Sequence, residues 1–542
     1  MGATTQLILS TALFALFLAI RRLVSGKKPA PLPPGPKGKP IIGNLFDLPS
    51  AGKQEWQHWL EHKELYGVWD RMEHSTLTAD AGTGPLSSVT VLGQTIVIIN
   101  DRSLALHILE KNSAKHSSRP HLVFAELAGW GQVPSSQDNT SLLRTYRRAM
   151  TRVLGMHASA SRFDHLLEVE ARRFLWRVLQ TPQDFLHHTR TAAGAFILKI
   201  IYGYNIQPHS EDPLVALADL ALQQFSHALV PGVWLVDIIP ALKYVPEWFP
   251  GAGFQKTARY YRETVTKAAE DPFTFTKYQM SYKAHRPSFV SELLEQGEDD
   301  HIIKWGALGL YGGGADTTVS ALEGFFLAMT LFPEVQRNAH DEIDRVLGSS
   351  ALPTVADRSR LPYIDALVKE TLRWHIVAPG GIPHRTDEDD VVNGFLIPKD
   401  AILMPNIWAF NHDPTVHPEP SQFRPERYLS DEGRDTEPDP HDTVFGFGRR
   451  ICPGRLVADT SLFLTIAHTI AVFDITKSTD QDGKEIDPPV EFTPGLLSHP
   501  VPYTCAFTAR SEQHRALILD FERNTPFETG DAERLAEALG TH

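Results

Sequence analysis

The strongest constraint on the fold is a series of long helical patterns with only two strand–turn–strand stretches among them. Apolar residues recur at helical spacing in 102–112, 142–154, 163–180, 302–331, 334–346 and 362–375. Hairpins are predicted at 86–100, with Gly93 at the turn, and at 391–405, with Asn393-Gly394 at the turn. Strands and helices do not alternate, which disfavours a doubly wound sheet. The sequence predicts a mainly α fold with small β-sheets (α+β).

Composition excludes several classes of protein. The 542 residues are 42% hydrophobic, enough for a large core, which excludes a disordered or fibrous chain. Lys and Arg total 52 against 65 Asp and Glu, a net charge of −13, and no long basic run indicates nucleic-acid binding. The only two cysteines, Cys452 and Cys505, cannot form a disulfide framework or a cysteine-only zinc site.

The first residues predict a membrane anchor. Residues 4–20 are uncharged and rich in Leu, Phe, Ala and Ile, at the short limit for crossing a ~30 Å hydrocarbon layer. Arginine and lysine follow this run and do not precede it, so the N-terminus is expected in the lumen and the rest in the cytosol. The alternative is a helix that lies in the interface. The predicted boundaries are an anchor at 1–22, a basic, proline-rich linker at 23–40, a globular domain at 41–510 and a C-terminal extension at 511–542.

Two further segments leave alternatives open. Residues 225–254 are rich in Trp, Pro, Val and Ile, and could be either core or an apolar surface that enters the membrane. Residues 68–85 are polar and without periodicity, which indicates a surface loop or a retained intron.

A lone cysteine lies in a glycine-rich loop that reads FGFGRRICPGR over 445–455. Glycines allow a tight loop and the close approach of a bulky, flat group. The apolar run 456–473 predicts a buried helix directly after Cys452, so backbone N–H groups and the nearby arginines would favour a thiolate. A thiolate is the form that binds a metal. The alternative is an ordinary buried cysteine beside a turn.

The spacing of this loop resembles the haem-thiolate signature of the cytochrome P-450 monooxygenases. Three further motifs occur in the family's order, so the resemblance covers about 30–510. It implies a P-450 fold in which 41–510 is the haem-thiolate catalytic domain, with Cys452 as axial iron ligand. The matching loop residues are Phe445, Gly448, Arg450, Cys452 and Gly454, and the expected structural triad is Glu370 and Arg373 in KETLR with Arg427 in FRPERY.

The fourth motif is GGGADTT, residues 312–318, inside a helical pattern. Each glycine destabilises a helix by about 1 kcal/mol relative to alanine, so three glycines in a row indicate a structural or functional requirement. A tight helix crossing or the end of a helix would explain them. The resemblance instead implies that Gly313 and Gly314 keep the helix slim over the haem, and that Asp316 and Thr317 form the catalytic acid–alcohol pair that relays protons.

The resemblance also implies the cofactors and partners. The cofactor is haem b, with Arg147, His384 and Arg450 as candidate partners for its propionates. His384 could instead be a surface histidine, and Leu143 stands where many relatives have a tryptophan donor. Because the chain has no flavin or nicotinamide domain, electrons are expected from NADPH through a separate cytochrome P-450 reductase.

The expected function is oxygen insertion into an apolar small molecule at the endoplasmic reticulum membrane, by a single-pass protein with a cytosolic catalytic domain. The segment 233–254 resembles fungal secondary-metabolism members near the O-methylsterigmatocystin oxidoreductase-like group, so the expected substrate is a terpenoid or polyketide. The alternatives are a haem-thiolate peroxide isomerase or dehydratase, and a haem-binding protein without turnover. No nucleic-acid partner is expected.

Overall fold

A computed structural model describes residues 29–50, 52–66, 84–208, 210–229, 233–430 and 435–541. The predicted anchor at 1–22 and residues 68–83 of the predicted loop lie outside these ranges. The described helices are α2 (Glu55–Leu65), α3 (Arg102–Ala105), α4 (Val123–Leu127), α5 (Ser141–Leu154), α6 (His157–Ala160), α7 (Asp164–Gln180), α8 (Phe185–Tyr202), α9 (Pro213–Ala228), α10 (Leu235–Ile238), α11 (Gly253–Ser281), α12 (Phe289–Glu295), α13 (Asp300–Leu331), α14 (Pro333–Leu347), α15 (Pro362–Trp374), α16 (Ile407–Asn411), α17 (His441–Val444), α18 (Arg455–Val472), α19 (Glu512–Asn524) and α20 (Ala532–Leu539).

The strands form one four-stranded sheet and two two-stranded sheets, β4-β5 and β7-β8, which confirms the mainly α architecture with small sheets. The larger sheet has the order β1-β2-β6-β3, in which β2 and β6 are parallel and the other pairs antiparallel. The strands are β1 (Leu86–Val91), β2 (Gln94–Ile99), β3 (His384–Arg385), β4 (Asp390–Val392), β5 (Phe395–Ile397), β6 (Ile402–Pro405), β7 (Phe473–Lys477) and β8 (Cys505–Ala509).

Both predicted turns are present. Leu92 and Gly93 connect β1 to β2, and Asn393 and Gly394 connect β4 to β5; all four have positive φ, as a tight hairpin turn requires. The stretch 391–405 nevertheless serves two sheets, because the strand after the hairpin, β6, pairs with β2 and β3.

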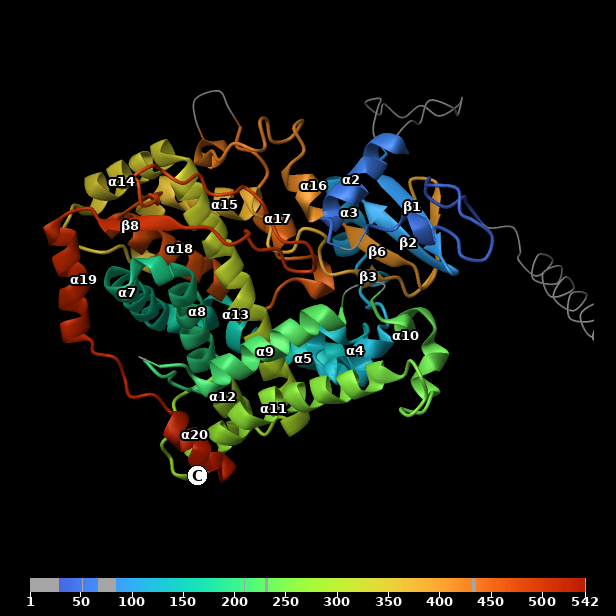
Figure 1. Cartoon of the computed structure of the whole chain (residues 1–542), viewed down its shortest axis with the longest axis horizontal. Helices are drawn as coiled ribbons and strands as arrows, with labels where there is room; N and C mark the ends of the chain where they lie inside the picture. The colour runs from blue at the N-terminus through green and yellow to red at the C-terminus, as the bar shows by residue number, and fades with distance from the viewer. Residues whose placement is uncertain are drawn as a thin grey trace, which may run out of the picture.

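The centre of the helical part is α13, which packs against α5, α8, α15 and α18 (Figure 1). Of the described residues, α18 alone is a single helix long and apolar enough to cross a membrane, and 72% of its apolar window is buried inside the protein. The bent pair α13 and α14 passes the same test together, with 102° between them. Their burial identifies α13 and α18 as core helices.

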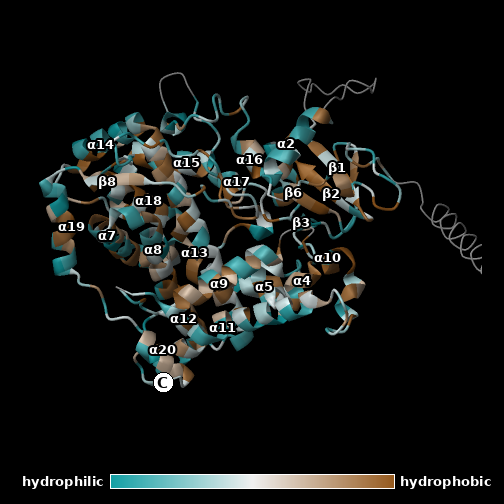
Figure 2. Cartoon of the chain, in the orientation of Figure 1, coloured by the Kyte–Doolittle hydropathy of each residue, from teal (hydrophilic) through white to brown (hydrophobic). Residues whose placement is uncertain are grey.

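Residues 233–249 lie on the surface. Six large apolar side chains around α10 are exposed, and Trp248 keeps 81% of its surface in solvent. Figure 2 shows apolar residues in this region, at the same end of the molecule as the four-stranded sheet. The sequence left two alternatives for 225–254, a part of the core or an apolar surface, and this exposure excludes the core for most of 233–249. The exposed side chains are Val233, Leu235, Ile239, Tyr244, Trp248 and Phe249.

The C-terminal extension packs on the helical body. Helix α19 contacts α7 and α20 contacts α11. Between them, the buried Asp531 accepts hydrogen bonds from the Asn205 backbone and from Arg286, both at 2.9 Å. Glu528 pairs with Lys199 and accepts a hydrogen bond from the Asn205 side chain.

Candidate functional site

A backbone hydrogen bond closes the loop around Cys452, which lies between α17 and α18. The Cys452 N–H donates to the Phe445 carbonyl at 2.7 Å, and Gly446 and Gly448 have φ of +78° and +49°. Glycine is required at 448 for a second reason, since a Cβ there would lie 2.6 Å from Ser113 Cβ. The loop is therefore fixed against the segment that follows α3.

Cys452 lies half-buried, three residues before the first residue of α18. Burial raises the pKa of its thiol, while backbone N–H groups of Gly454 and Arg455 and the charge of Arg147 act in the opposite direction. These helix-terminus donors and cations stabilise the thiolate that a metal ion would bind.

The three predicted propionate partners come together from three segments. The side chain of Arg147 in α5 has no hydrogen bond or ion pair with any described residue, and burial lowers its pKa. His384 begins β3 and is buried, with Nδ1 donating to the His116 carbonyl at 2.6 Å and Nε2 unpartnered among the described residues. Arg450 donates to the carbonyls of Ser117, Pro134 and Gln137.

His384 is not a surface histidine. Burial and the Arg119 charge hold its pKa well below its usual range, so the imidazole is neutral when Nε2 has no partner. An anionic oxygen at Nε2 would favour the charged form and gain a donor.

Arg119 belongs to this cationic cluster, and sequence analysis did not identify it. Its Nη1 donates to the carbonyls of Ile382 and Pro383 at 2.8 and 2.6 Å, just before β3. Burial, with Arg450 nearby, lowers its pKa well below the usual value. Arg119, Arg147 and Arg450 form no ion pair with the described residues, although the charges of Asp138 and Asp387 act on Arg450 from a greater distance. Three guanidinium groups and His384 therefore meet with no described carboxylate in direct contact. Such a cluster suits a dianionic ligand.

Helix α13 is partly exposed at residues 312–317, although the rest of its length is largely buried. A Cβ at Gly313 would meet nothing within 4 Å, so this glycine faces open space. A Cβ at Gly314 would lie 2.7 Å from Ile197 Cδ1, so Gly314 instead permits the close crossing of α8. Thr317 Oγ1 donates to the Gly313 carbonyl at 2.7 Å, within the same open stretch.

Asp316 is held by a residue that sequence analysis missed. Its Oδ2 lies 3.3 Å from His499 Nε2, and His499 Nδ1 lies 2.8 Å from Glu323 Oε2. Burial would raise the pKa of Asp316, but His499 and the charge of Arg190 lower it, which keeps the carboxyl ionised.

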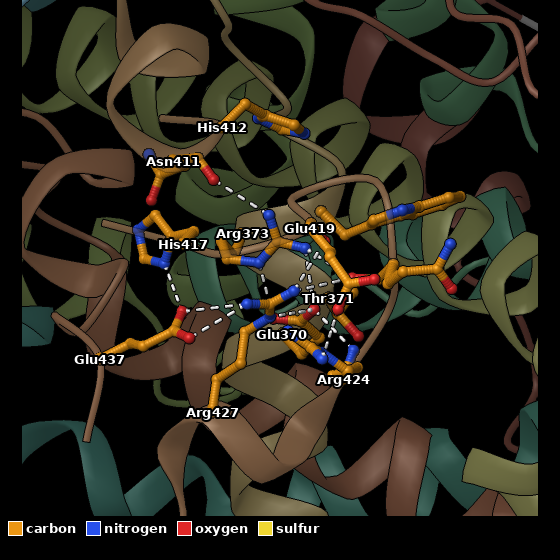
Figure 3. Close-up of polar contacts among 12 residues, drawn as sticks. Glu370, Thr371, Arg373, Asn411, His412, His417, Glu419, Arg424, Arg427 and Glu437 are labelled. Carbon is orange, nitrogen blue, oxygen red and sulfur yellow. Dashed lines mark hydrogen bonds and ion pairs between the residues drawn. The ribbon is translucent and has the colours of Figure 1, made fainter. Parts of the chain in front are cut away.

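The predicted triad residues form one buried network between α15 and the loops before and after Arg427 (Figure 3). Glu370 accepts from Arg373 Nε and Nη2 at 2.7 and 2.8 Å, and lies 3.4 Å from Arg427 Nε. Arg427 also pairs with Glu437 at 3.0 Å. The remaining guanidinium donors of Arg373 bind the Asn411 and Gln422 carbonyls, so every charge has a partner.

These residues fit a haem group. The half-buried thiol at a helix start, the unpaired Arg147, the open Nε2 of His384 and the empty space at Gly313 and Gly454 match a thiolate-ligated, flat dianion. A helical protein with this cysteine loop and this buried triad has the features of a haem-thiolate protein.

Comparison with known proteins identifies the family. A family model described as cytochrome P-450 matches residues 33–507. The chain is 46% identical to "Cytochrome P-450 monooxygenase claR" of Ampulloclitocybe clavipes, over 92% of this chain and 91% of that protein. It is 44% identical to "Cytochrome P-450 monooxygenase ppsD" of Aspergillus oryzae, over 95% of both chains. It is 42% identical to "O-methylsterigmatocystin oxidoreductase" of Aspergillus flavus, over 98% of both. The chain belongs to the cytochrome P-450 family and is a monooxygenase, as the cysteine loop predicted.

Proposed function

We propose that this chain inserts one oxygen atom from O2 into an apolar small molecule, a fungal secondary metabolite of terpenoid or polyketide type, with electrons from NADPH through a separate reductase. The observation that carries the proposal is the half-buried thiol of Cys452 at the start of α18, beside the unpaired cation of Arg147. The relatives whose names include O-methylsterigmatocystin oxidoreductase support the substrate class.

Cys452 would ligate the haem iron, and Arg119, Arg147, His384 and Arg450 would hold the two propionates. When bound, a thiolate-ligated haem iron activates dioxygen and favours cleavage of the O–O bond. The carbonyls that bind Arg119 and Arg450 fix these two guanidinium groups before the ligand arrives, and Arg147 keeps free donors for the ligand. Nε2 of His384 would become a donor once an anionic oxygen beside it favours the protonated imidazole. Phe445 and Gly448 shape the cysteine loop, and Gly454, where a Cβ would meet nothing within 4 Å, would let the backbone approach the haem.

Thr317 and Asp316 would supply the protons that oxygen insertion consumes. The Thr317 hydroxyl now donates to the Gly313 carbonyl, and rotation about its Cα–Cβ bond would turn the hydroxyl toward the open side of α13. Asp316 is the adjacent acid and is ionised, so it must receive each proton before it passes it on.

We also place the protein on the endoplasmic reticulum membrane, with the single anchor at 1–22, the linker at 23–40, the catalytic domain at 41–510 in the cytosol and the extension at 511–542. The exposed apolar side chains of 233–249 support a second membrane contact. Deletion of residues 4–22 should release the protein from membranes on fractionation, and full retention of the shortened protein would show that the contact within 225–254 is enough to hold it there.

The reductase would bind near the cysteine loop, where Arg449 is exposed and Arg455 half-buried. An acidic partner surface would complement these charges. The chain's own relatives are named as monooxygenases, which supports an external electron supply.

The decisive experiment compares Cys452→Ser with Cys505→Ser in a yeast host that supplies a reductase and is fed terpenoids, polyketides and fatty acids. Cys505 lies buried in β8 and serves as the control. A product heavier by one oxygen atom, lost in Cys452→Ser and kept in Cys505→Ser, supports the proposal. A product that forms without a reductase would favour the peroxide isomerase. An unchanged spectrum of the reduced carbon monoxide adduct in Cys452→Ser would contradict the assignment of Cys452 as the iron ligand.

A further inference from the structure

A charged cluster lies beside the acid–alcohol pair, on the side of α13 that faces residues 493–499. Asp316, Ser320 and Glu323 occupy one face of the helix at spacings of four and three residues. Opposite them, His499 is bonded to both acids, and Arg190 of α8 lies 3.4 Å from Glu323 Oε1. We call these four charged residues, Asp316, His499, Glu323 and Arg190, the distal cluster.

The position of His499 is fixed by its backbone. Its N–H donates to Thr493 Oγ1 at 2.9 Å and its carbonyl accepts from Thr493 N at 2.7 Å. The preceding residue, Ser498, is bound to α13 through the Ser320 hydroxyl at 2.6 Å. The imidazole therefore stays between the two carboxylates without relying on the ion pairs alone.

The cluster holds His499 in its charged form. Burial by itself would lower the pKa of His499, but the hydrogen bonds and charges of Asp316 and Glu323 raise it to about 9. The other charged or titratable groups nearby are Arg190 from α8, Asp219 from α9 and His375 after α15. Burial, followed by His499 itself, lowers the pKa of His375 to about 3, so His375 stays neutral.

The cluster also reaches from the helix interior to solvent. Glu323 is nearly inaccessible, whereas the Arg190 side chain at the far end keeps 47% of its surface exposed and the His499 side chain keeps 18%. A proton can thus reach His499 from water without crossing the apolar core.

We propose that His499 is a positioning residue that stores a proton and delivers it to Asp316 during turnover. The step rests on the proposed function of the acid–alcohol pair. The N–H bond at Nε2 breaks and an O–H bond forms at Asp316 Oδ2, which leaves a neutral imidazole whose Nδ1–H still donates to Glu323. Solvent then returns a proton to Nε2, so each proton that Asp316 passes on is replaced.

The test uses His499→Gln, which keeps the size and polarity of the side chain but cannot carry a charge. His375→Gln is the matched control, because it also removes a buried histidine next to Ser320 but one that is already neutral. Both are assayed as holoenzymes by reductase-driven NADPH oxidation without added substrate, over a range of pH and in heavy water.

We expect His499→Gln to lower the rate about ten-fold and to increase the solvent deuterium effect. The loss is smaller than the roughly 100-fold or more that a general acid contributes, because solvent can still protonate Asp316. In the parent enzyme, the rate should fall as pH rises through about 9. This decline should disappear in His499→Gln and persist in His375→Gln. An unchanged rate, pH profile and isotope effect in His499→Gln would overturn the proposal.

A second measurement does not depend on turnover. In histidine ¹³C NMR of the reduced, carbon monoxide-bound enzyme, the resonance that is missing in His499→Gln should have a midpoint near pH 9, and the resonance of His441, also near pH 9, should be present in both proteins. An ordinary midpoint overturns the proposal. If His499→Gln fails to fold, Glu323→Gln should lower the midpoint of His499 and slow NADPH oxidation, and no change in either would count against the relay.

Thr317→Ala distinguishes a failure of the relay through His499 from a failure of the proposed proton delivery by Asp316 and Thr317. If Thr317→Ala diverts electrons to hydrogen peroxide while His499→Gln behaves as the parent, the acid–alcohol pair stands and the relay through His499 is wrong. If Thr317→Ala also leaves the peroxide yield unchanged, the proposed proton route itself is wrong.

Discussion

Glu370 accepts two hydrogen bonds from Arg373, at 2.7 and 2.8 Å, and neither side chain has any surface in solvent. Each of these buried charges has lost its hydration, and the opposite charge of its partner compensates for that loss. Removing either charge therefore destabilises the folded protein. Glu370 also accepts a hydrogen bond from the Arg424 backbone N–H, and Arg373 donates one to the Gln422 carbonyl. The pair therefore fixes the chain just before Arg427.

Glu370→Gln should therefore cost about 3–5 kcal/mol of unfolding free energy, since it leaves Arg373 buried without its counter-charge. Haem content and urea unfolding measure the effect. Arg523→Gln is the control, because it removes one partner of an exposed helix pair and should leave both unchanged. Equal stability of the two variants would contradict the role of the pair.

Arg147→Gln and Arg148→Gln test the propionate cluster at adjacent positions of α5. Arg147 is half-buried and unpaired among the described residues, whereas Arg148 is exposed. Loss of a charge-assisted hydrogen bond, worth roughly 1.5–3 kcal/mol, should weaken haem retention of Arg147→Gln by roughly 10- to 100-fold. Transfer of haem to apomyoglobin measures retention, and Arg148→Gln should match the parent. Equal retention by both variants would remove Arg147 from the site.

Gly448→Ala tests how the cysteine loop is fixed. The added Cβ would lie 2.6 Å from Ser113 Cβ and 2.8 Å from the Leu109 carbonyl, at a positive φ. The strain should cost about 1–3 kcal/mol and lower haem incorporation. Gly253→Ala, at the start of α11 with nothing within 4 Å, should leave both properties near the parent level. Normal haem incorporation in Gly448→Ala would show that the loop can move.

His441 should make stability depend on pH above neutrality. Burial would lower its pKa, but hydrogen bonds to Asp439 and Asp459, at 2.6 and 3.0 Å, raise it to about 9. Because the folded pKa exceeds the ordinary value of 6.5, the stabilisation is fully present below about pH 6.5 and disappears as pH rises through about 9.

The measurement is urea unfolding of the parent and His441→Gln. The parent should be more stable by roughly 3 kcal/mol near pH 6, and the difference should shrink toward zero near pH 10. Comparing the two proteins at each pH removes the contributions of other titrating groups. A difference that does not change with pH would mean that His441 is neutral in the folded protein.

The sequence predicted what local periodicity and short motifs determine. The helices 142–154 and 163–180, the two hairpin turns and the buried network of Glu370 and Arg373 all occur in the structure. In each case the relevant residues lie close together in the chain or repeat at a regular spacing.

Contacts between distant segments were not predictable. His499 meets Asp316 across 183 residues, and Arg119 meets the chain before His384 across more than 260. Neither residue lies in a periodic pattern, so only the fold reveals it. The glycines of α13 show the same limit: the sequence placed Gly313 and Gly314 together, while the structure separates an open position from a helix crossing with Ile197.

The C-terminal extension has a consequence for how the chain is made. Lys199 and Glu528 are separated by 329 residues, and Asp531 joins Asn205 across 326. Glu528 lies in one pocket with three cations that are synthesised long before it, Arg173, Arg177 and Lys199. Until Glu528 has been synthesised, these cations lack that carboxylate. These contacts can form only after Asp531 has been synthesised, more than 320 residues after Asn205 and Lys199.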